Sequence, residues 1–572
     1  MVSPLRLKSQ KVGKPEVAVH NPVLSVLVDT GVYHLDQPYD YLLPNKFEIN
    51  PGDWVSIPFR GKTSLGLVVN RKSSSTISKM EFINRPAKAE PIAPEFIELY
   101  RKIAERWAVP IFDVLRFVAR HKLSVNTKQL EFPKQSKNSG IRSYLQLQPV
   151  KNEISQVKEF AEKIAESGKT LLIVPESRTQ ELSSSSKYHV AMRSGILKPE
   201  RYENILILRE ESELHYEIKS PGFNTRDVAL LRNDLFKENL FFIGFSPSLE
   251  MANLIAKGYV QLKKAPGKVK VAAKPSLQGE LIPSGLVSKV KDALKRGSIL
   301  VLAPSKGYGI AVSCLKCRNI ANCICGGRLT KRSKADDPSC VICQKSYPAW
   351  RCSDCGNQQI RIIGKGIERI AEEFGKSFPN TDIHISTAEK RIDGVISKRS
   401  IVLSTIGAAP IQGYSSVLFL DGINMAADLR SEERALSNFF RYSSLCTGEV
   451  LIVDRPESPL VSALMRWNPF NILDRNLSEL KELYLPPNSR HFLLKGEKSE
   501  IPRIFTGLQN ASKQGRISSS LRLYNIDDSY ISGYFSLKDA QQILQFIREF
   551  QRKRSMSGKP PLALRVDPYL LG

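Results

Sequence analysis

The sequence predicts a multidomain α/β protein. We expect a small N-terminal β-barrel-like domain, two α/β lobes with a cysteine-rich insertion in the second, and an α+β C-terminal domain. The chain has 572 residues, a length typical of roughly three to five domains. Apolar strand-like runs alternate with helical patterns in its middle, which is typical of parallel sheets covered on both faces. Eight of the nine cysteines form four close pairs in one short stretch.

Short strands dominate the N-terminal part of the chain. Prolines, glycines and aspartates, which favour turns, bound the runs Val23–Asp29, Gln37–Pro44, Trp54–Phe59 and Ser64–Val69. The last two runs alternate as a hairpin with Arg60, Gly61 and Lys62 near its tip. Apolar residues at helical spacing follow over Pro94–Arg120, so we expect helices to complete this domain.

The middle of the chain alternates between helices and buried strands. The first set is a helix at Glu153–Glu166 and strands at Thr170–Val174, Ile205–Leu208 and Leu240–Gly244. The second set has helices at Pro283–Lys295 and Gly366–Phe378 and strands at Ser298–Ala303, Thr381–Ile385, Ile401–Ser404 and Ser416–Leu420. The expected divisions are a flexible basic arm at 1–21, an N-terminal domain at 22–127, a connector at 128–148, a first lobe at 149–270, a second lobe at 271–475 with an insertion at 313–357, and a C-terminal domain at 476–572.

The chain is strongly basic, with a formal net charge of +27 and a pI of about 9.6. Such a charge attracts polyanions, of which nucleic acid is the first candidate and an anionic membrane surface the second. No apolar stretch reaches about 18 residues and no basic amphipathic helix stands out, so we expect no membrane partner. The basic N-terminus lacks the apolar segment of a secretion signal, which favours a cytoplasmic location. There, paired cysteines favour metal ligands over disulfides.

The most specific feature is the cysteine block, with the spacing C-x2-C-x5-C-x-C-x14-C-x2-C-x8-C-x2-C. Four pairs of thiolates match two tetrahedral Zn²⁺ sites, and closed four-coordinate sites of this kind are structural rather than catalytic. The predicted ligands are Cys314, Cys317, Cys323, Cys325, Cys340, Cys343, Cys352 and Cys355, whereas Cys446 stands alone. Buried free thiols and an iron site of the rubredoxin type are the alternatives.

Spacing alone leaves the pairing of these cysteines open. Nested pairing joins the first pair with the fourth and the second with the third, whereas sequential pairing joins neighbours. Only Ile324 separates the cysteines of the second pair, which strains a standard knuckle and makes the inner site the harder one to build. The stretch between the inner pairs carries four basic residues that suit phosphate contacts or plain solvation, namely Arg328, Lys331, Arg332 and Lys334.

Motifs spread from about residue 22 to the end of the chain match one known family. They are Tyr39–Pro44, Val55–Phe59, Gly66–Val69, Lys306–Tyr308 leading to Cys314–Cys317, Gly366–Arg369, Leu485–Pro487 and Val566–Pro568. On these residues the chain resembles PriA, the primosomal replication-restart family also called primosomal protein N′. The resemblance implies a 3′-DNA-end-binding domain, two RecA-like helicase lobes and a zinc-binding insertion. It also implies nested pairing of the cysteines, although the third pair is spaced one residue shorter here.

The resemblance places a pocket for the terminal 3′ nucleotide of a leading strand at Tyr39, Asp40 and Tyr41. An aromatic ring can stack on a base, and a carboxylate can accept a hydrogen bond from a free 3′-hydroxyl. On a regular strand, however, the two tyrosines share one face and Asp40 points to the other, so all three cannot line one pocket. Core tyrosines are therefore the alternative. We also expect DNA contacts from Arg60 and Lys62.

The phosphate-binding loop of the family is missing. Ser167-Gly168-Lys169-Thr170 imitates such a loop, but Lys163 stands where its first glycine belongs. A helix is expected before this segment and a strand after it, which is the inverse of the required order. The segment therefore caps a helix C-terminus, whose partial negative charge repels phosphate. In the family, the P-loop precedes this helix, whereas the imitation segment follows it.

Three further helicase motifs are eroded. The strand Ile205–Leu208 leads to Arg209-Glu210-Glu211-Ser212, where the family has Asp-Glu-Glu-His, so a guanidinium stands where Mg²⁺ should bind. The third motif is altered at Gly244–Ser248, and Arg441 is the lone basic residue of Phe439–Gly448, where the sixth motif should lie. We therefore expect degenerate helicase lobes that bind neither ATP nor Mg²⁺, much as in divergent PriA-like proteins of high-GC Gram-positive bacteria.

These observations predict a replication-restart primosome protein that binds forked, branched or single-stranded DNA and is not an enzyme. Its affinity would come from phosphate contacts and fall steeply with salt. The resemblance implies other replication-restart proteins and single-stranded-DNA-binding protein as partners. Two Zn²⁺ ions are the expected cofactors. An active ATP-dependent 3′→5′ DNA helicase and a zinc-ribbon RNA-binding factor are the alternatives.

Overall fold

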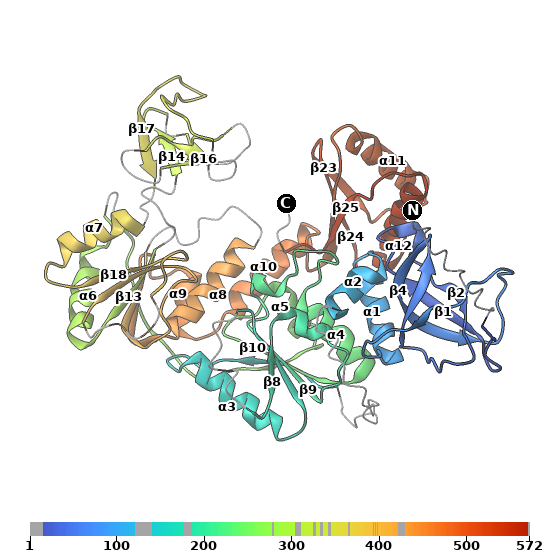
Figure 1. Ribbon diagram of the computed structural model, residues 1–572. Helices are drawn as coiled ribbons and strands as arrows, with labels where there is room; N and C mark the ends of the chain where they lie inside the picture. The colour runs from blue at the N-terminus through green and yellow to red at the C-terminus, as the bar shows by residue number, and fades with distance from the viewer. Residues whose placement is uncertain are drawn as a thin grey trace, which may run out of the picture.

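The computed structural model describes residues 15–119, 140–176, 182, 186–276, 280–303, 311–317, 319–323, 328–331, 336–340, 345–363, 367–392, 394, 396, 399–420 and 430–569. They form a multidomain α/β protein (Figure 1). An antiparallel N-terminal sheet and the C-terminal sheet lie at one end, two parallel sheets occupy the middle and the other end, and the cysteine-rich insertion projects from the second parallel sheet.

The N-terminal sheet has the strand order β2-β1-β4-β3-β5 and is antiparallel throughout. Its strands are β1 (Val23–Val28), β2 (Tyr39–Leu42), β3 (Trp54–Phe59), β4 (Lys62–Lys72) and β5 (Arg85–Pro86). Arg60 and Gly61, both with positive φ, form the two-residue turn predicted between β3 and β4. The segment 81–87 bonds to Leu42 on β2 and to β3, so it touches both edges of the sheet. The predicted helices follow as α1 (Pro94–Arg106) and α2 (Ile111–Ala119).

The first parallel sheet has the order β11-β6-β10-β9-β7-β8. Its strands are β6 (Arg142–Gln146), β7 (Thr170–Ile173), β8 (His189–Ala191), β9 (Asn204–Leu208), β10 (Asn239–Gly244) and β11 (Gln261–Lys263). Strands β7, β9 and β10 confirm the predicted apolar runs. Strand β6 corrects the prediction, because it lies inside the stretch assigned to a connector. Its residues mix polar and apolar types, so it lacks the all-apolar signature of a buried parallel strand.

Helices cover both faces of this sheet, and the alternation of side chains along the strands sorts them into two cores. Leu172 and Leu206 pack on the side of α3 (Glu153–Ala165). Ile205 and Ile207 face the other way, in the core that holds α1, α2 and α4 (Thr225–Phe236). Helix α5 (Leu249–Ala256) and the 3₁₀ turns η3 (Arg193–Leu197) and η4 (Glu213–His215) complete the lobe, as η1 (Tyr33–Leu35) does in the N-terminal domain.

The second parallel sheet has the order β12-β21-β20-β13-β19-β18. Its strands are β12 (Lys270–Ala273), β13 (Ile299–Ala303), β18 (Ile383–Ser386), β19 (Ile401–Thr405), β20 (Tyr414–Phe419) and β21 (Cys446–Ile452). Helices α6 (Ser284–Arg296) and α7 (Ile367–Ser377) pack on one face. Helices α8 (Ser431–Ser443), α9 (Pro459–Met465) and α10 (Phe470–Glu482) belong to the core of the other face.

The cysteine-rich insertion leaves this sheet after β13 and returns at α7, as predicted. Strand β14 (Ala311–Cys314) pairs with β17 (Ile360–Ile363), and β15 (Leu329–Thr330) pairs with β16 (Ser339–Cys340). The insertion has a small core of its own. In Figure 1 it stands away from both parallel sheets.

The C-terminal domain folds in the order β22 (Ser489–Lys495), α11 (Ile501–Lys513), β23 (Arg522–Asp527), β24 (Tyr530–Ser536), α12 (Ala540–Met556) and β25 (Ala563–Val566). This βαββαβ unit makes an antiparallel sheet of order β23-β24-β22-β25. Both helices share a core with one face of the sheet. Among the described residues, no helix is long and apolar enough to cross a membrane.

Candidate functional site

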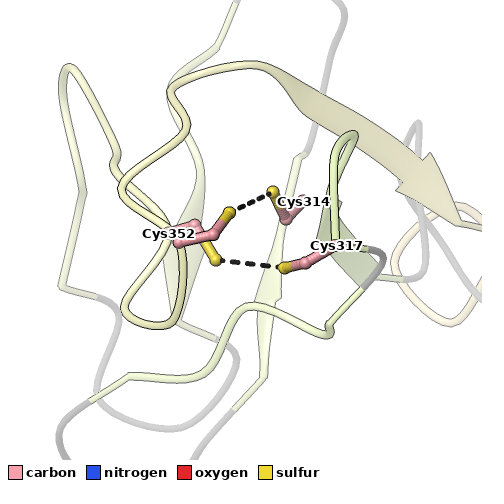
Figure 2. A group of neighbouring side chains, drawn as sticks. Cys314, Cys317 and Cys352 are labelled. Atoms are coloured by element: carbon pink, nitrogen blue, oxygen red, sulfur yellow. Dashed lines mark hydrogen bonds between the residues drawn. The ribbon is translucent and has the colours of Figure 1, made fainter.

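Four cysteines converge in the insertion (Figure 2). Their Sγ atoms all lie within 4.8 Å of one another. The Sγ–Sγ distances are 3.4 Å between Cys314 and Cys355 and 3.5 Å between Cys317 and Cys352. Four sulfurs around a tetrahedral Zn²⁺ with bonds of about 2.3 Å would lie about 3.8 Å apart. The first and fourth cysteine pairs are thus brought together, as nested pairing requires, in a cluster that could hold a metal ion.

The local backbone explains why these cysteines converge. The N–H of Cys314 donates to the carbonyl of Asn319 at 2.9 Å, and the N–H of Cys352 donates to the carbonyl of Asn357 at 2.9 Å. Both turns therefore fold back over five residues and aim their sulfurs at the same point. In the same way, the N–H of Cys340 donates to the carbonyl of Lys345, five residues later, at 3.0 Å. The third cysteine pair thus begins a turn that matches the two turns of the cluster.

The inner site is only partly described. Cys323 and Cys340 are buried in the small core of the insertion, and the hydroxyl of Tyr347 donates to Cys323 Sγ at 3.0 Å. Cys325 and Cys343 lie outside the described residues. Of the four predicted basic contacts, Arg328 and Lys331 are half-buried, while Arg332 and Lys334 lie outside the described residues.

The predicted 3′-end pocket is divided between the two faces of β2. The side chain of Tyr41 is buried in the barrel core, and its hydroxyl donates to the carbonyl of Pro58 at 3.0 Å. Tyr39 is half-buried on the same face and makes an edge-to-face contact with Phe59, with 5.2 Å between ring centroids. Asp40 contacts Ser25 and Lys72 on the opposite side.

The carboxylate of Asp40 is held by three donors of its own domain. Ser25 Oγ and Ser75 Oγ each donate to it at 2.7 Å, and Lys72 Nζ donates at 3.2 Å. Partial burial opposes ionisation, but these hydrogen bonds outweigh it and hold the pKa of Asp40 below its ordinary value. The carboxylate therefore stays ionised and oriented near neutral pH.

An accessible cationic and aromatic surface lies next to Tyr39. Arg60 and Lys62 are exposed in the hairpin, and the Arg60 guanidinium lies 5.9 Å from the ring centroid of Phe59. Phe59 therefore links Tyr39 to Arg60. Sequence reasoning placed Arg60 and Lys62 here but missed Phe59, for which the only signal was its position at the end of an alternating strand.

The position of a phosphate-binding loop, between β6 and α3, is filled by the chain itself. Asn152 caps α3 by accepting a hydrogen bond from the N–H of Ser155 at 3.1 Å. The N–H of Gln148 donates to the side chain of Gln156 at 2.9 Å, and Pro149 has no N–H to offer. The N–H groups of Gln148 and Ser155 are therefore committed to side chains of the protein itself and are not free to bind a phosphate.

The imitation loop lies where the sequence predicted, between the end of α3 and the start of β7. Gly168 adopts a positive φ, and the ammonium of Lys169 forms an ion pair with Glu200. Lys169 therefore lies at the opposite end of the parallel strands from the β6–α3 loop. The β6–α3 loop follows its strand, whereas this segment precedes β7.

Arg209, which follows β9, lies between carboxylates of two other segments of the first lobe. Its guanidinium lies 3.3 Å from Glu153 and 3.0 Å from Glu176. Arg441, on α8 of the second lobe, lies 3.4 Å from Glu176 and 3.9 Å from Glu153. We call these four residues the interlobe cluster. Arg209 and Glu153 are only 5% and 4% exposed, whereas the side chains of Glu176 and Arg441 are each 21% exposed. The charges of the cluster therefore neutralise one another at the border of the protein interior.

The two glutamates after Arg209 are also committed to the protein. Glu210 accepts from the N–H and the hydroxyl of Ser248 at 2.7 and 2.9 Å and lies 3.3 Å from Arg226. Glu211 accepts from the hydroxyl of Ser437 at 2.9 Å. Burial, reinforced by the charge of Glu210, raises the pKa of Glu211 to about 8. Glu211 is therefore largely protonated at neutral pH and a poor ligand for Mg²⁺.

Helix α8 carries the contacts between the lobes, about one per turn. Glu433 accepts from the N–H of Leu249 at 3.3 Å, Ser437 reaches Glu211, and Arg441 reaches the interlobe cluster. Arg430, just before the helix, pairs with Glu250. A single apolar core continues beneath these contacts from α3 and β10 into β20 and α8. The two lobes are thus packed together through this core, beside a cavity of about 370 Å³ to which both lobes contribute charged side chains.

Sequence reasoning identified Arg209 and Arg441 but missed their partners. Glu153 opens a helix and Glu176 follows a strand, and either position is ordinary for a solvated glutamate. Glu153 and Glu176 come together only because the carboxyl ends of β6, β7 and β9 lie at the same end of the parallel sheet. The available signal was two arginines at motif positions next to apolar runs, because a guanidinium group near a core requires carboxylate partners.

Comparisons with known proteins agree with this organisation. Residues 25–119 match the 3′ DNA-binding domain (3′BD) of PriA. A probable replication restart protein PriA of Mycobacterium tuberculosis is 25% identical, with 82% of this chain and 86% of that protein covered. The replication restart protein PriA of Rickettsia conorii is 23% identical, over 69% of this chain and 74% of that protein. The crystal structure of the E. coli DExH-box NTPase HrpB is 11% identical, with 60% of this chain and 46% of the HrpB chain covered. The TM-score of this match is 0.27, which is too low to indicate a shared fold.

The matched domain comprises the antiparallel sheet with α1 and α2, and the mycobacterial relative covers 82% of this chain. The resemblance noted from Tyr39–Pro44 and the cysteine block is therefore confirmed. This chain is similar to replication restart proteins of the PriA family over most of its length, and its residues 25–119 match the model of their 3′ DNA-binding domain.

Proposed function

We propose that this protein binds forked or branched DNA in replication restart and recruits other restart factors there, without the activity of an ATP-driven helicase. The observation that carries the proposal is the interlobe cluster. Arg209 and Arg441 are paired with Glu153 and Glu176 at the edge of the sheet where a helicase would hold its nucleotide and magnesium. Similarity to PriA proteins and the match of residues 25–119 to their 3′ DNA-binding domain support the DNA-binding part.

Electrostatics makes a residual nucleotide site unfavourable. Magnesium takes carboxylate and phosphate oxygens, but Glu153 and Glu176 are already neutralised by arginines. Separating buried ion pairs to admit a nucleotide would leave charges uncompensated, which costs about 3–5 kcal/mol for each broken pair. The continuous core beneath α8 also opposes the opening of the lobes that a helicase cycle requires.

DNA recognition is proposed for three places. Tyr39 would stack on the terminal base of a 3′ end, Arg60 and Lys62 would contact its backbone, and the basic residues of the insertion would bind phosphates. Asp40 could meet a 3′-hydroxyl only through a distorted strand or a displaced donor. The domain divisions of the sequence analysis, except for the connector that contains β6, and a cytoplasmic location remain part of the proposal.

We propose that the insertion binds two Zn²⁺ ions. Cys314, Cys317, Cys352 and Cys355 would hold one ion, and the four inner cysteines the other. The backbone N–H of Cys340 donates to the carbonyl five residues later, as those of Cys314 and Cys352 do, and this supports a second site. Zinc would fix the turns of the insertion as a rigid platform for single-stranded DNA or a partner protein.

ATP hydrolysis measured with and without forked DNA tests the proposal. We expect tight, salt-sensitive binding of forked DNA and no turnover above the buffer background. A duplex of the same length and composition is the DNA control, because the proposal predicts a preference for structure rather than sequence. DNA-stimulated turnover that disappears in Lys169→Ala would overturn the account of the imitation loop and restore the helicase alternative.

A further inference from the structure

Helices α11 and α12 of the C-terminal domain leave an open groove between them. Both helices line a cavity of about 500 Å³, and Figure 1 shows α11 at the outside of the molecule. Gly507 widens the groove from the α11 side, because a Cβ at this position would meet nothing within 4 Å. We call this cavity and the residues that line it the α11–α12 groove.

The floor of the α11–α12 groove is apolar. Ile504, Leu508 and Ala511 supply it from α11, at the spacing of one helical face. Phe546 and Phe550 supply it from α12, one turn apart. Both phenylalanines are only half-buried, so their rings remain partly accessible. Two apolar stripes on neighbouring helices make a groove that suits the apolar face of a third helix.

The rim of the α11–α12 groove is cationic. Among the described residues that line it, five are basic and Glu549 alone is acidic. This acid is already engaged, because Glu549 lies 3.4 Å from Arg552, which does not line the groove. The five basic residues are Arg503, Arg516, Lys553, Arg554 and Lys559.

The protein neutralises only part of this positive charge. Arg554 and Lys559 lie 2.5 and 3.2 Å from Glu500, the residue before α11. In the part of the chain that the structure describes, no carboxylate forms an ion pair with the other three cations of the rim. The groove therefore keeps unbalanced positive charge beside its apolar floor, which favours an acidic ligand.

The two helices that form the groove are held in place from other sides. On α12, Arg548 lies 2.6 Å from Asp36 of the N-terminal domain, and Ser555 bonds to His34 at 2.8 Å. On α11, Leu508 belongs to the core shared with the sheet. A ligand would therefore meet a surface that is already formed, which lowers the entropy cost of binding.

An acidic helix satisfies both the floor and the rim, whereas a phosphodiester chain would meet the cations and leave the apolar floor unfilled. We infer that the α11–α12 groove binds an acidic amphipathic helix of a partner protein, whose apolar side chains contact the floor and whose carboxylates meet the rim. The 13 residues of α11 correspond to about 20 Å of helix, so a partner helix of similar length would span the groove. The inference rests on the proposed function and identifies the chemistry of one recruited factor.

A designed peptide tests the inference with the full-length protein. It has about 16 residues, or about four helical turns, with leucines along one face and glutamates along the other, and it carries a fluorescent label for anisotropy. A second peptide has the same composition, but its leucines are distributed around the helix. We expect the first peptide to bind at least about tenfold more tightly, because only this peptide presents an apolar stripe.

Gly507→Trp fills the groove with a side chain. Gly507 is exposed in an α-helix, where other residues are more favourable than glycine, so the variant should fold. Binding of the amphipathic peptide should weaken about tenfold. Lys553→Glu reverses one charge of the rim and should weaken binding about fivefold at low salt and less at high salt. Lys513→Glu makes the same change of charge on α11 outside the groove, so it is the matched control and should bind as the unchanged protein does.

A photoreactive group in the amphipathic peptide gives a second readout, with crosslinks expected in α11 or α12. Equal binding of the two peptides, or unchanged binding by Gly507→Trp, would overturn this inference, while binding of forked DNA would still support the proposed function. Displacement of the peptide by oligothymidine, together with weaker oligothymidine binding by Gly507→Trp, would overturn it by assigning the groove to nucleic acid. Failure of the unchanged protein to bind forked DNA would overturn the proposed function, whatever the peptide does.

Discussion

Arg209 Nε lies 3.3 Å from Glu153 Oε1, which ties the residue after β9 to the first residue of α3. A glutamate at the start of a helix is favoured by the helix dipole, as a phosphate would be. The arginine then balances that glutamate as a metal ion would balance a phosphate. Two side chains of the protein thus reproduce the charge pattern of a metal ion beside a phosphate.

Replacing Arg209 with alanine should destabilise the lobes, because Glu153 would remain buried without its main partner. We expect the free energy of unfolding to fall by about 3–5 kcal/mol, measured by urea denaturation followed through intrinsic fluorescence. Lys169→Ala breaks the exposed pair with Glu200 and is the control, with an expected loss of at most about 1 kcal/mol. Equal losses in the two variants would show that the cluster is no more important than a surface pair.

The stability of the protein should fall between about pH 5 and pH 8 because of Glu211. Burial and the neighbouring Glu210 raise the pKa of Glu211 from 4.5 to about 8. The folded chain therefore binds this proton more tightly than the unfolded chain does. The resulting stabilisation is complete below about pH 4.5 and is lost as pH rises through the folded-state pKa.

Glu211→Gln tests that expectation, because glutamine mimics the protonated side chain and can still accept from Ser437. The variant should be more stable than the unchanged protein at about pH 9, and its stability should depend less on pH. Glu98→Gln alters an exposed carboxylate on α1 and should leave the pH profile as it was. A Glu211→Gln profile with the original slope would contradict the assignment.

Patterns local in sequence predicted most of the fold. The all-apolar runs at β9, β10 and β13 became buried parallel strands, and the turn at Arg60-Gly61 became the tip of a hairpin. Strand β6 escaped prediction because its polar residues bond outside the sheet. Arg142 donates to Asn233 at 2.6 Å, and Gln146 donates to the carbonyl of Trp467 at 3.1 Å. Such partners are known only once the tertiary structure is formed.

The candidate sites divide in the same way. Cys314 and Cys352 could be assigned from spacing, because the C-x2-C turn is a local structure. The alternation of Tyr39, Asp40 and Tyr41 also predicted correctly that their side chains split between two faces. By contrast, the interlobe cluster depends on residues that lie far apart in the sequence.

Tyr39 and Tyr41 should have separable roles. Tyr39→Ala removes the accessible ring beside Phe59 and should weaken binding of DNA with a free 3′ end about tenfold, with a smaller effect on DNA whose 3′ end is blocked. Tyr41→Phe removes the hydrogen bond to Pro58 and should lower the free energy of unfolding by about 1 kcal/mol while DNA binding is kept. Anisotropy and urea denaturation measure the two effects. Loss of 3′-end binding in Tyr41→Phe would contradict a purely structural Tyr41.

Substitution of single cysteines should reveal how many metal ions the insertion holds. Cys352→Ser removes a ligand of the described cluster, and Cys340→Ser removes one of the inner set. Because a closed site needs four ligands, each variant should lose about one zinc per chain by mass spectrometry of the metal, and the double variant should lose about two. Cys446→Ser changes a lone buried thiol in β21 and should lose none. A full complement in Cys340→Ser would reduce the insertion to one site. The lobes should keep their stability in every variant, because the insertion has its own core and their shared core lies elsewhere.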